Sequence, residues 1–259
     1  MVRFLRSLGG MVRLTAIFAF GALGLILKRP ATRVQRAEWL HSFCMRTLPR
    51  MGIAFRQQGT YPEHGVVISN HMGYLDIMAF AALHRCVFVS KAEIGKWPII
   101  GWMTTMAGTV YVERGRGGSA NRAKGDIQAA AAEGLPVIFF PEGTSSDGSS
   151  VLPFRSGLLT ESIAAGQSIT AAFVRYRLIR DNGPDVAIEN RVSYWDDTPI
   201  ALHIFRLVGL RGIEVDVSFA DSPIAFSSAA ATDRRVAAVE ARAAVMELGG
   251  VIEPEAVAT

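Results

Sequence analysis

Six short apolar runs, separated by longer segments, constrain the fold of this 259-residue chain more than any other feature. Each run has the length of a buried strand, and several of the segments between them show helical periodicity. Strands that alternate with helices of this kind are typical of an α/β sheet with helices on its faces. We therefore predict one such domain over residues 37–249, with strands at Val66–Ser69, Cys86–Val89, Thr109–Val112, Val137–Phe140, Ile169–Arg175 and Ile213–Phe219.

Four helices are predicted from apolar spacing and from the residues at their ends. The first covers Arg36–Leu48 and should end before Pro49, because a proline ring interrupts helical hydrogen bonding. A second lies within 119–134, between a capping serine and a glycine, and a third covers Leu158–Ala165. The last helix covers Asp233–Leu248, and the apolar residues expected on its buried face are Val236, Val239, Ala243 and Met246.

The first 36 residues are basic and apolar. Their uninterrupted apolar run, Leu14–Leu27, would form a helix of about 21 Å, shorter than a hydrocarbon core of about 30 Å. Basic residues flank both ends of the run, and no acidic residue precedes Glu38. We predict that residues 1–36 associate with an anionic membrane surface as an interfacial or re-entrant segment whose ends are both cytoplasmic. A cleaved signal peptide is the alternative, but the run ends without a small-x-small cleavage site.

Composition also favours contact with a membrane. Only 19% of the residues are charged and the mean hydropathy is +0.26, whereas globular domains average about 25% charged residues. The basic N-terminal residues are not interleaved with stacking aromatic residues, so we expect no nucleic-acid partner. Cys44 and Cys86 lack the spacing of a disulfide framework or a zinc site, and no metal is expected. Residues 250–259 are expected to form a flexible tail.

His71 and Asp76 follow the first predicted strand and are the candidate catalytic pair. Ligand and active sites of α/β sheets form at strand ends. Five residues apart on one regular helix, the two side chains would point about 140° away from each other, so a turn has to bring them together. Gly73 permits such a turn, which would place Asp76 in the first turn of a following helix. The carboxylate could then orient the imidazole as a general base. The alternative is a structural histidine and a helix-capping aspartate.

Two further strands end in polar residues that are suited to substrate binding. After the strand Val137–Phe140, the turn that contains Glu142, Gly143 and Thr144 offers backbone N–H groups to an anion and a carboxylate to a polar headgroup. Arg114 follows another strand and could hold a phosphate or carboxylate through two hydrogen bonds. Lys91, at the start of Lys91-Ala92-Glu93, is also a candidate substrate-binding residue. Each of these features taken alone is also compatible with an ordinary turn or a solvated charge.

Together these segments resemble the glycerolipid acyltransferase family, which includes the 1-acyl-glycerol-3-phosphate acyltransferases. Asn70-His71 through Asp76 is similar to the family's His-x4-Asp signature, 108–114 to its arginine block, and 140–144 to its Pro-Glu-Gly-Thr block. The resemblance implies a mixed sheet flanked by helices. It also implies catalysis by His71 and Asp76. Ser145 stands where many members have arginine, and residues 142–154 and 195–197 look like those of the branch that acylates lyso-ornithine lipid.

The function that this resemblance implies is transfer of a fatty acyl group from a thioester to the hydroxyl of a lysolipid at the cytoplasmic face of the cell membrane. The expected acceptor is 1-acyl-glycerol-3-phosphate, giving phosphatidic acid, and lyso-ornithine lipid is the alternative. The donor would be acyl-CoA or acyl carrier protein, with no cofactor. A non-catalytic membrane-binding protein is an alternative of another class. A hydrolase or NTPase is disfavoured, because the chain has neither a Gly-x-Ser-x-Gly elbow nor a Walker A sequence.

Overall fold

The structure is a computed structural model that describes residues 2–96, 100–112 and 119–251. It contains one seven-stranded sheet in the order β1-β7-β6-β2-β5-β3-β4. Every neighbouring pair is parallel except β6 and β7, so the sheet is mixed, as expected. The strands are β1 (Ile53–Gln58), β2 (Val66–Ser69), β3 (Val87–Lys91), β4 (Val110–Val112), β5 (Val137–Phe139), β6 (Ile169–Leu178) and β7 (Ile213–Phe219).

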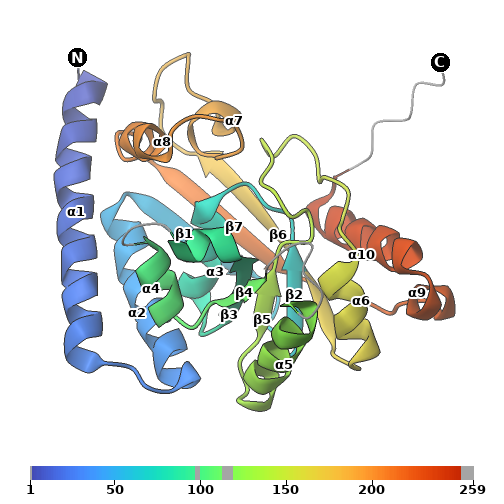
Figure 1. The fold of residues 1–259 in the computed structure, drawn as a ribbon. Coiled ribbons are helices and arrows are strands. Elements are labelled where there is room, and N and C mark those ends of the chain that lie inside the picture. Colours follow the sequence, from blue (N-terminus) through green and yellow to red (C-terminus); the bar gives the residue numbers. More distant parts are fainter. Residues whose placement is uncertain (1, 97–99, 113–118, 252–259) are drawn as a thin grey trace, which may run out of the picture.

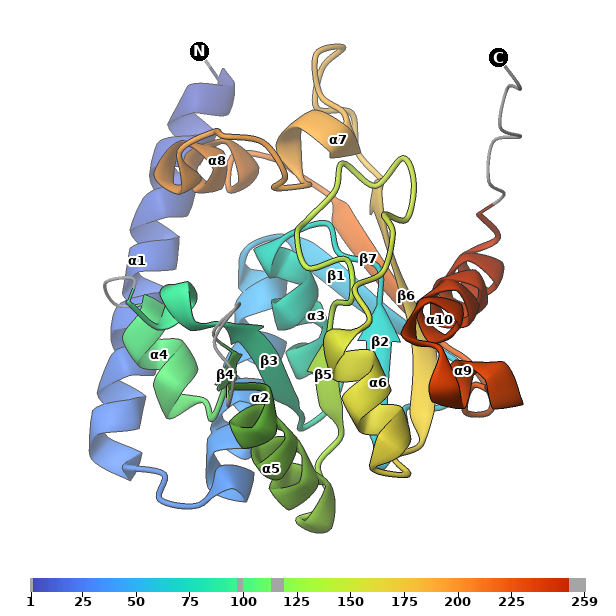
Figure 2. The same ribbon diagram turned by 45° about the vertical axis from the view of Figure 1, so that its right-hand side comes forward.

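Helices cover both faces of this sheet (Figures 1 and 2). The successive residues Val66 and Val67 of β2 belong to separate buried clusters, as expected for side chains that alternate between the faces of a strand. The helices are α1 (Val2–Lys28), α2 (Arg33–Arg50), α3 (Tyr74–Leu83), the 3-10 helix η1 (Ala92–Lys96), α4 (Ile100–Met106), α5 (Ser119–Ala132), α6 (Gly157–Ala164), α7 (Ile188–Arg191), α8 (Ile200–Leu207), α9 (Ser228–Thr232) and α10 (Arg234–Gly249).

The two buried clusters show which helices lie on which face. Side chains of α2 and α3, including Phe43 and Phe80, pack with Val67 on one face. Side chains of α5, α6 and α10 pack with Val66 on the other, and Leu159 of α6 is fully buried there. Burying these side chains, at roughly 25 cal/mol per Å² of apolar area, is the main force that holds the helices on the sheet.

All six predicted strands are present, with ends within three residues of the prediction. The predicted end of the first helix is wrong, because α2 includes Pro49 and ends at Arg50. Proline is tolerated in this last turn because only one helical N–H is lost, and the N–H of Met51 still caps the carbonyl oxygens of Thr47 and Leu48 at 3.0 Å. The strand β1 was not predicted, because only Ile53 of its six residues is buried and the apolar signal is weak.

The buried face of α10 also differs from the prediction. Val239, expected in the core, is 67% exposed, and Ala243 is exposed as well. The helix instead turns a face rich in small residues to the sheet, where Gly249 packs directly against the ring of Phe173. Small side chains allow this close approach, so here packing distance decided the orientation more than side-chain hydrophobicity. The buried residues of α10 are Ala237, Ala238, Ala241, Val245, Met246 and Gly249.

The N-terminal helix α1 is longer than the expected apolar run. It spans 27 residues, because the basic residues before Leu14 are helical too. By length and composition α1 is able to cross a membrane. It nevertheless lies alongside the domain (Figure 1), with Ser7 near one end and Leu25 near the other both buried. Gly10 and Gly21 bring α1 close, because an added Cβ would lie 2.6 Å from the Val208 carbonyl oxygen and 2.5 Å from the Phe43 ring, respectively.

Candidate active site

The site begins where β2 ends, at the carboxyl edge of the sheet. Asn70 follows the last residue of β2 and is buried. Its side chain replaces strand pairing with hydrogen bonds to β6: the amide nitrogen donates to the Val174 carbonyl oxygen at 3.0 Å, and its oxygen accepts from the Val174 N–H at 2.8 Å. The loop that follows therefore leaves the sheet from a fixed point.

His71 and Asp76 meet across this loop, as the sequence predicted. His71 Nδ1 lies 2.8 Å from Asp76 Oδ2. Asp76 is in the first turn of α3 and is completely buried, whereas the His71 side chain is 19% exposed. Because Nδ1 faces the carboxylate, the tautomer with its proton on Nδ1 leaves Nε2 as a hydrogen-bond acceptor. Nε2 forms no hydrogen bond with any described residue.

The remaining contacts of Asp76 hold its carboxylate in place. Oδ2 also accepts the backbone N–H groups of Met72 at 2.6 Å and Gly73 at 3.0 Å. Oδ1 accepts the hydroxyl of Tyr176 at 2.7 Å. Tyr176 reaches Asp76 because β6 extends beyond the last residue of β2, so that its final residues lie beside the loop. Both oxygens of this buried carboxylate are therefore hydrogen-bonded, which fixes its orientation.

Gly73 is required at the turn between His71 and Asp76. Its backbone has φ 153° and ψ −169°, a region open in practice only to glycine. A side chain would also collide with the covering segment, because an added Cβ would lie 3.1 Å from the backbone nitrogen and Cβ of Tyr194. The expected role of Gly73 in permitting the turn is therefore supported by both its conformation and its surroundings.

Besides Asp76, the imidazole of His71 contacts the ring of Phe140, the residue after β5. The two rings are stacked, with centroids 4.1 Å apart and planes 10° from parallel. Stacking fixes the plane of the imidazole while the hydrogen bond to Asp76 fixes its rotation in that plane. The imidazole is thus held in one orientation by the protein itself, an arrangement that is compatible with general-base catalysis.

Glu142 connects the turn after β5 to residues 70–73, the histidine loop, which carries His71. Its side chain is 3% exposed, and its two oxygens accept the N–H groups of His71 at 2.8 Å and Leu152 at 3.1 Å. Burial raises the pKa of Glu142 to about 8, although the two N–H donors act in the opposite direction. We expected Glu142 to contact substrate, but its hydrogen bonds are to backbone groups of its own chain, which favours a positioning role.

The other candidate substrate-binding residues lie at the same edge of the sheet. Thr144 is exposed, and Gly143 adopts φ 69° in the turn. Lys91 is the last residue of β3, which runs parallel to β5, so it lies at the same carboxyl edge. Arg114 is outside the described residues. The strand β4 that precedes it ends at this edge too, because it pairs in parallel with β3.

A segment of the long connection between β6 and β7 covers the histidine loop. The Tyr194 N–H donates to the Met72 carbonyl oxygen at 2.8 Å, and the Ser145 hydroxyl donates to the Tyr194 carbonyl oxygen. Farther along the connection, His203 on α8 is buried and its Nδ1 lies 3.0 Å from the Tyr74 hydroxyl. Burial lowers the pKa of His203, so this histidine stays neutral near pH 7.

Sequence reasoning missed three residues of this site: Phe140, Tyr176 and Tyr194. Phe140 was predicted as the end of a strand and the first residue of the 140–144 block, but not as a contact of His71. Tyr176 is one hundred positions from Asp76, and no local pattern marks it as a partner. Among the described residues, no group of three or more histidine, cysteine, aspartate or glutamate side chains is arranged to hold a metal ion. The arrangement that is present can remove a proton from a group brought to His71 Nε2.

Comparisons with known proteins agree with the resemblance. Residues 52–175 match the protein-family model described as Acyltransferase. A lyso-ornithine lipid O-acyltransferase from Rhodobacter capsulatus is 32% identical over 173 residues, which are 64% of this chain and 60% of that protein. A 1-acyl-sn-glycerol-3-phosphate acyltransferase from Neisseria gonorrhoeae is 34% identical over 165 residues, or 61% of either protein. The aligned part of the chain thus spans about three fifths of the length of these relatives.

The fold is also that of a solved structure. The crystal structure of the 1-acyl-sn-glycerophosphate acyltransferase from Thermotoga maritima superposes with a TM-score of 0.66 and covers 96% of this chain and 97% of its own. At 17% sequence identity, the likeness concerns the fold alone. It confirms the predicted mixed α/β sheet with flanking helices.

Proposed function

We propose that this chain, whose residues 52–175 belong to the acyltransferase family, is an enzyme that moves a fatty acyl group from a thioester to the hydroxyl of a lysolipid. One observation carries the proposal. His71 Nδ1 is bound by the buried carboxylate of Asp76 at 2.8 Å, while Nε2 faces no partner among the described residues. A histidine held in this way is suited to accept a proton from a hydroxyl.

In the proposed reaction, His71 Nε2 removes the hydroxyl proton of the acceptor as its oxygen attacks the thioester carbonyl carbon. The new C–O bond forms and the C–S bond breaks, and the imidazolium returns the proton to the departing thiolate. Asp76 stabilises the positive charge that His71 carries between these steps. The lysolipid and the thioester together carry the same acyl groups and protons as the acylated lipid and the free thiol, so the reaction balances without a cofactor.

The proposed acceptor is 1-acyl-glycerol-3-phosphate, and the product is phosphatidic acid. Lyso-ornithine lipid is the alternative acceptor. The similarity to the Rhodobacter capsulatus protein, 32% identical, supports the alternative, and the similarity to the Neisseria gonorrhoeae protein, 34% identical, supports the first. Arg114, Lys91 and the exposed Gly143-Thr144 turn are proposed to hold the acceptor's anionic group. The proposed acyl donor is acyl-CoA or acyl carrier protein.

Association with the cytoplasmic face of the membrane is part of the proposal, since both the acceptor and the product would be lipids. The helix α1 is long and apolar. It packs along the domain from Ser7 to Leu25, which favours a helix lying in the interface over one that leaves the domain to span the bilayer. The acyl chains would then remain in the membrane while the polar group reaches His71.

The first experiment compares His71→Ala with a matched control, His64→Ala. His64 is exposed and lies outside the loop that carries the catalytic pair. Removing a general base costs about 10² to 10⁴ in rate. We expect His71→Ala to lose acyl transfer to that extent with an unchanged melting temperature, and His64→Ala to retain it. Equal turnover of both variants would refute the role of His71.

The same assay identifies the acceptor. Membranes carrying the protein receive lysophosphatidic acid and lyso-ornithine lipid side by side, with labelled acyl-CoA or labelled acyl carrier protein. Phosphatidic acid as the product supports the first acceptor, and ornithine lipid supports the alternative. Release of free fatty acid without transfer would indicate a hydrolase. Absence of any product, with intact folding and membrane binding, would favour a non-catalytic membrane-binding protein.

A further inference from the structure

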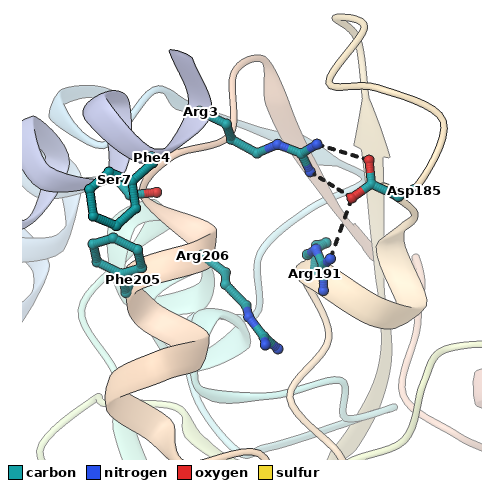
Figure 3. A pocket seen from close by; sticks show the side chains of 7 residues that line it. All are labelled: Arg3, Phe4, Ser7, Asp185, Arg191, Phe205 and Arg206. Carbon is teal, nitrogen blue, oxygen red and sulfur yellow. Dashed lines mark hydrogen bonds and ion pairs between the residues drawn. The ribbon is translucent and has the colours of Figure 1, made fainter. Parts of the chain in front are cut away.

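A cavity of about 260 Å³ opens between the first turn of α1 and the segment that carries α7 and α8. Figure 3 shows that three arginines from separate elements surround it: Arg3 of α1, Arg191 of α7 and Arg206 of α8. Asp185 is the only carboxylate among its lining residues. None of these residues contacts His71 or Asp76, so the cavity is separate from the candidate active site.

Positive charge exceeds negative charge around this cavity. Arg3 donates two hydrogen bonds to Asp185, at 2.8 and 3.1 Å, and Arg191 lies 3.6 Å from the same carboxylate. Arg206 also lines the cavity (Figure 3), is partly buried, and forms no hydrogen bond or ion pair with any described residue. Two guanidinium groups therefore share one carboxylate and the third has none, so the lining carries an excess of two positive charges.

Arg6 lies about one turn farther along α1, outside the residues that line the cavity. Its Nε and Nη1 atoms are buried and have no hydrogen-bond partner among the residues that the structure describes. A buried donor without an acceptor costs roughly 1–3 kcal/mol, and more when it is charged. The region thus has more arginine donors than its own side chains satisfy, which is the condition that an anionic ligand would relieve.

An aromatic pair lines the cavity beside these charges. Phe4, whose ring packs edge-on against Phe205 at 5.6 Å, is itself 58% exposed. A small inorganic anion would make no use of this apolar surface, but an anion attached to hydrocarbon chains would. Arginine also binds phosphate oxygens through two parallel hydrogen bonds, which a cluster of guanidinium groups favours.

We propose that this cavity binds the phosphate group of an anionic glycerolipid, with Arg191 and Arg206 contacting the phosphate and the acyl chains lying against α1. The lipid is a ligand of this second site and is not the molecule acylated at His71. The proposal therefore does not depend on the reaction proposed above. It gives α1 a defined lipid contact at its first turn, in addition to its exposed apolar side chains.

The test measures lipid binding to the full chain in a nonionic detergent by titration calorimetry. The probes are dihexanoyl phosphatidylglycerol, dihexanoyl phosphatidylcholine and inorganic phosphate. Arg206→Gln is compared with wild type and with Arg235→Gln, which removes the same charge from an exposed position on α10, across the molecule from α1 (Figure 1). Melting temperatures confirm that each variant is folded, and Arg206 has no partner among the described residues whose loss would unfold it.

We expect Arg206→Gln to weaken binding of dihexanoyl phosphatidylglycerol about tenfold or more, because a charge-assisted hydrogen bond is lost. Arg235→Gln should bind as wild type does, and phosphatidylcholine should bind weakly because its headgroup has no net charge. Equal effects of the two substitutions would overturn the proposal in favour of a general charge effect. Inorganic phosphate that binds as tightly as the lipid, in an Arg206-dependent way, would overturn the assignment to a lipid.

Discussion

Tyr176 is the residue of β6 whose side chain contacts the proposed catalytic pair, through Asp76. Burial raises the pKa of its phenol well above the usual range, so it remains a hydrogen-bond donor at any working pH. It contacts Asp76 and not the proposed substrate, which makes it a positioning residue. Without the 2.7 Å hydrogen bond, Asp76 Oδ1 would be buried with no donor, and the carboxylate would hold the His71 imidazolium more strongly.

For Tyr176→Phe we expect kcat to fall about tenfold with little change in KM, and the acidic limb of the pH–rate profile to move to higher pH. Steady-state kinetics over the pH range provide the measurement. Tyr61→Phe is the matched control, because Tyr61 is as buried as Tyr176 and makes no hydrogen bond to the pair among the described residues. If the two variants share one pH–rate profile, Tyr176 has no role beyond packing.

The contact between His71 and Asp76 was predictable from the sequence because the two residues lie five positions apart, on either side of one turn. The strand end, the glycine and the spacing of His71 and Asp76 are all local features. The roles of Glu142 and Tyr176 were not predictable in this way, because each depends on contacts across the sheet. Glu142 was predicted to bind substrate, and no local pattern indicated that both of its oxygens would accept backbone N–H groups. Local sequence identifies groups that can react, whereas tertiary contacts decide which groups hold them.

Among the helices, α1 has two faces that lie in different surroundings. One face packs on the domain, and the other exposes apolar side chains, of which Val12 is 74% and Phe20 is 75% exposed. A charged residue on the exposed face should therefore weaken membrane binding. We expect Val12→Glu to lower partitioning onto phosphatidylcholine vesicles about tenfold or more, because it removes apolar contact and adds a charge that must be desolvated.

The control for this prediction is Val239→Glu, which changes the same residue type at a 67% exposed position of α10. Sedimentation with vesicles measures both variants beside the wild-type protein. Val239→Glu should bind as wild type does. Equal loss in the two variants would mean that added charge acts through the whole molecule, and unchanged binding of Val12→Glu would mean that the exposed face of α1 does not enter the membrane.

Strands were easier to predict than the orientation of helices. Residues such as Val66, Val67 and Ile68 form a continuous apolar run that only a buried parallel strand accommodates. The edge strand β1 escaped notice because its side chains are mostly exposed. For α10, Val239 was expected in the core, but the helix approaches the sheet through alanine and glycine. The sequence shows which residues are apolar and does not show how close two elements will lie.

For the whole molecule, Glu142 predicts how stability depends on pH. Its pKa in the folded protein is raised to about 8, and the usual value for the unfolded chain is about 4.5. Between these values the folded state holds a proton that the unfolded state has released. The unfolding free energy must therefore fall as the pH rises through this window. Above about pH 8 both states are ionised and the loss is complete.

Glu142→Gln removes this titration while keeping the size of the side chain. Its amide satisfies only one of the two N–H groups, which lowers stability by an amount that does not vary with pH. We therefore expect the difference in unfolding free energy between wild type and variant to shrink from pH 5 to pH 8, by an amount on the order of a few kcal/mol. Urea titrations at several pH values measure it. Parallel curves for the two proteins would show that the N–H groups of His71 and Leu152 outweigh burial, so that Glu142 is already charged in the folded enzyme at pH 5.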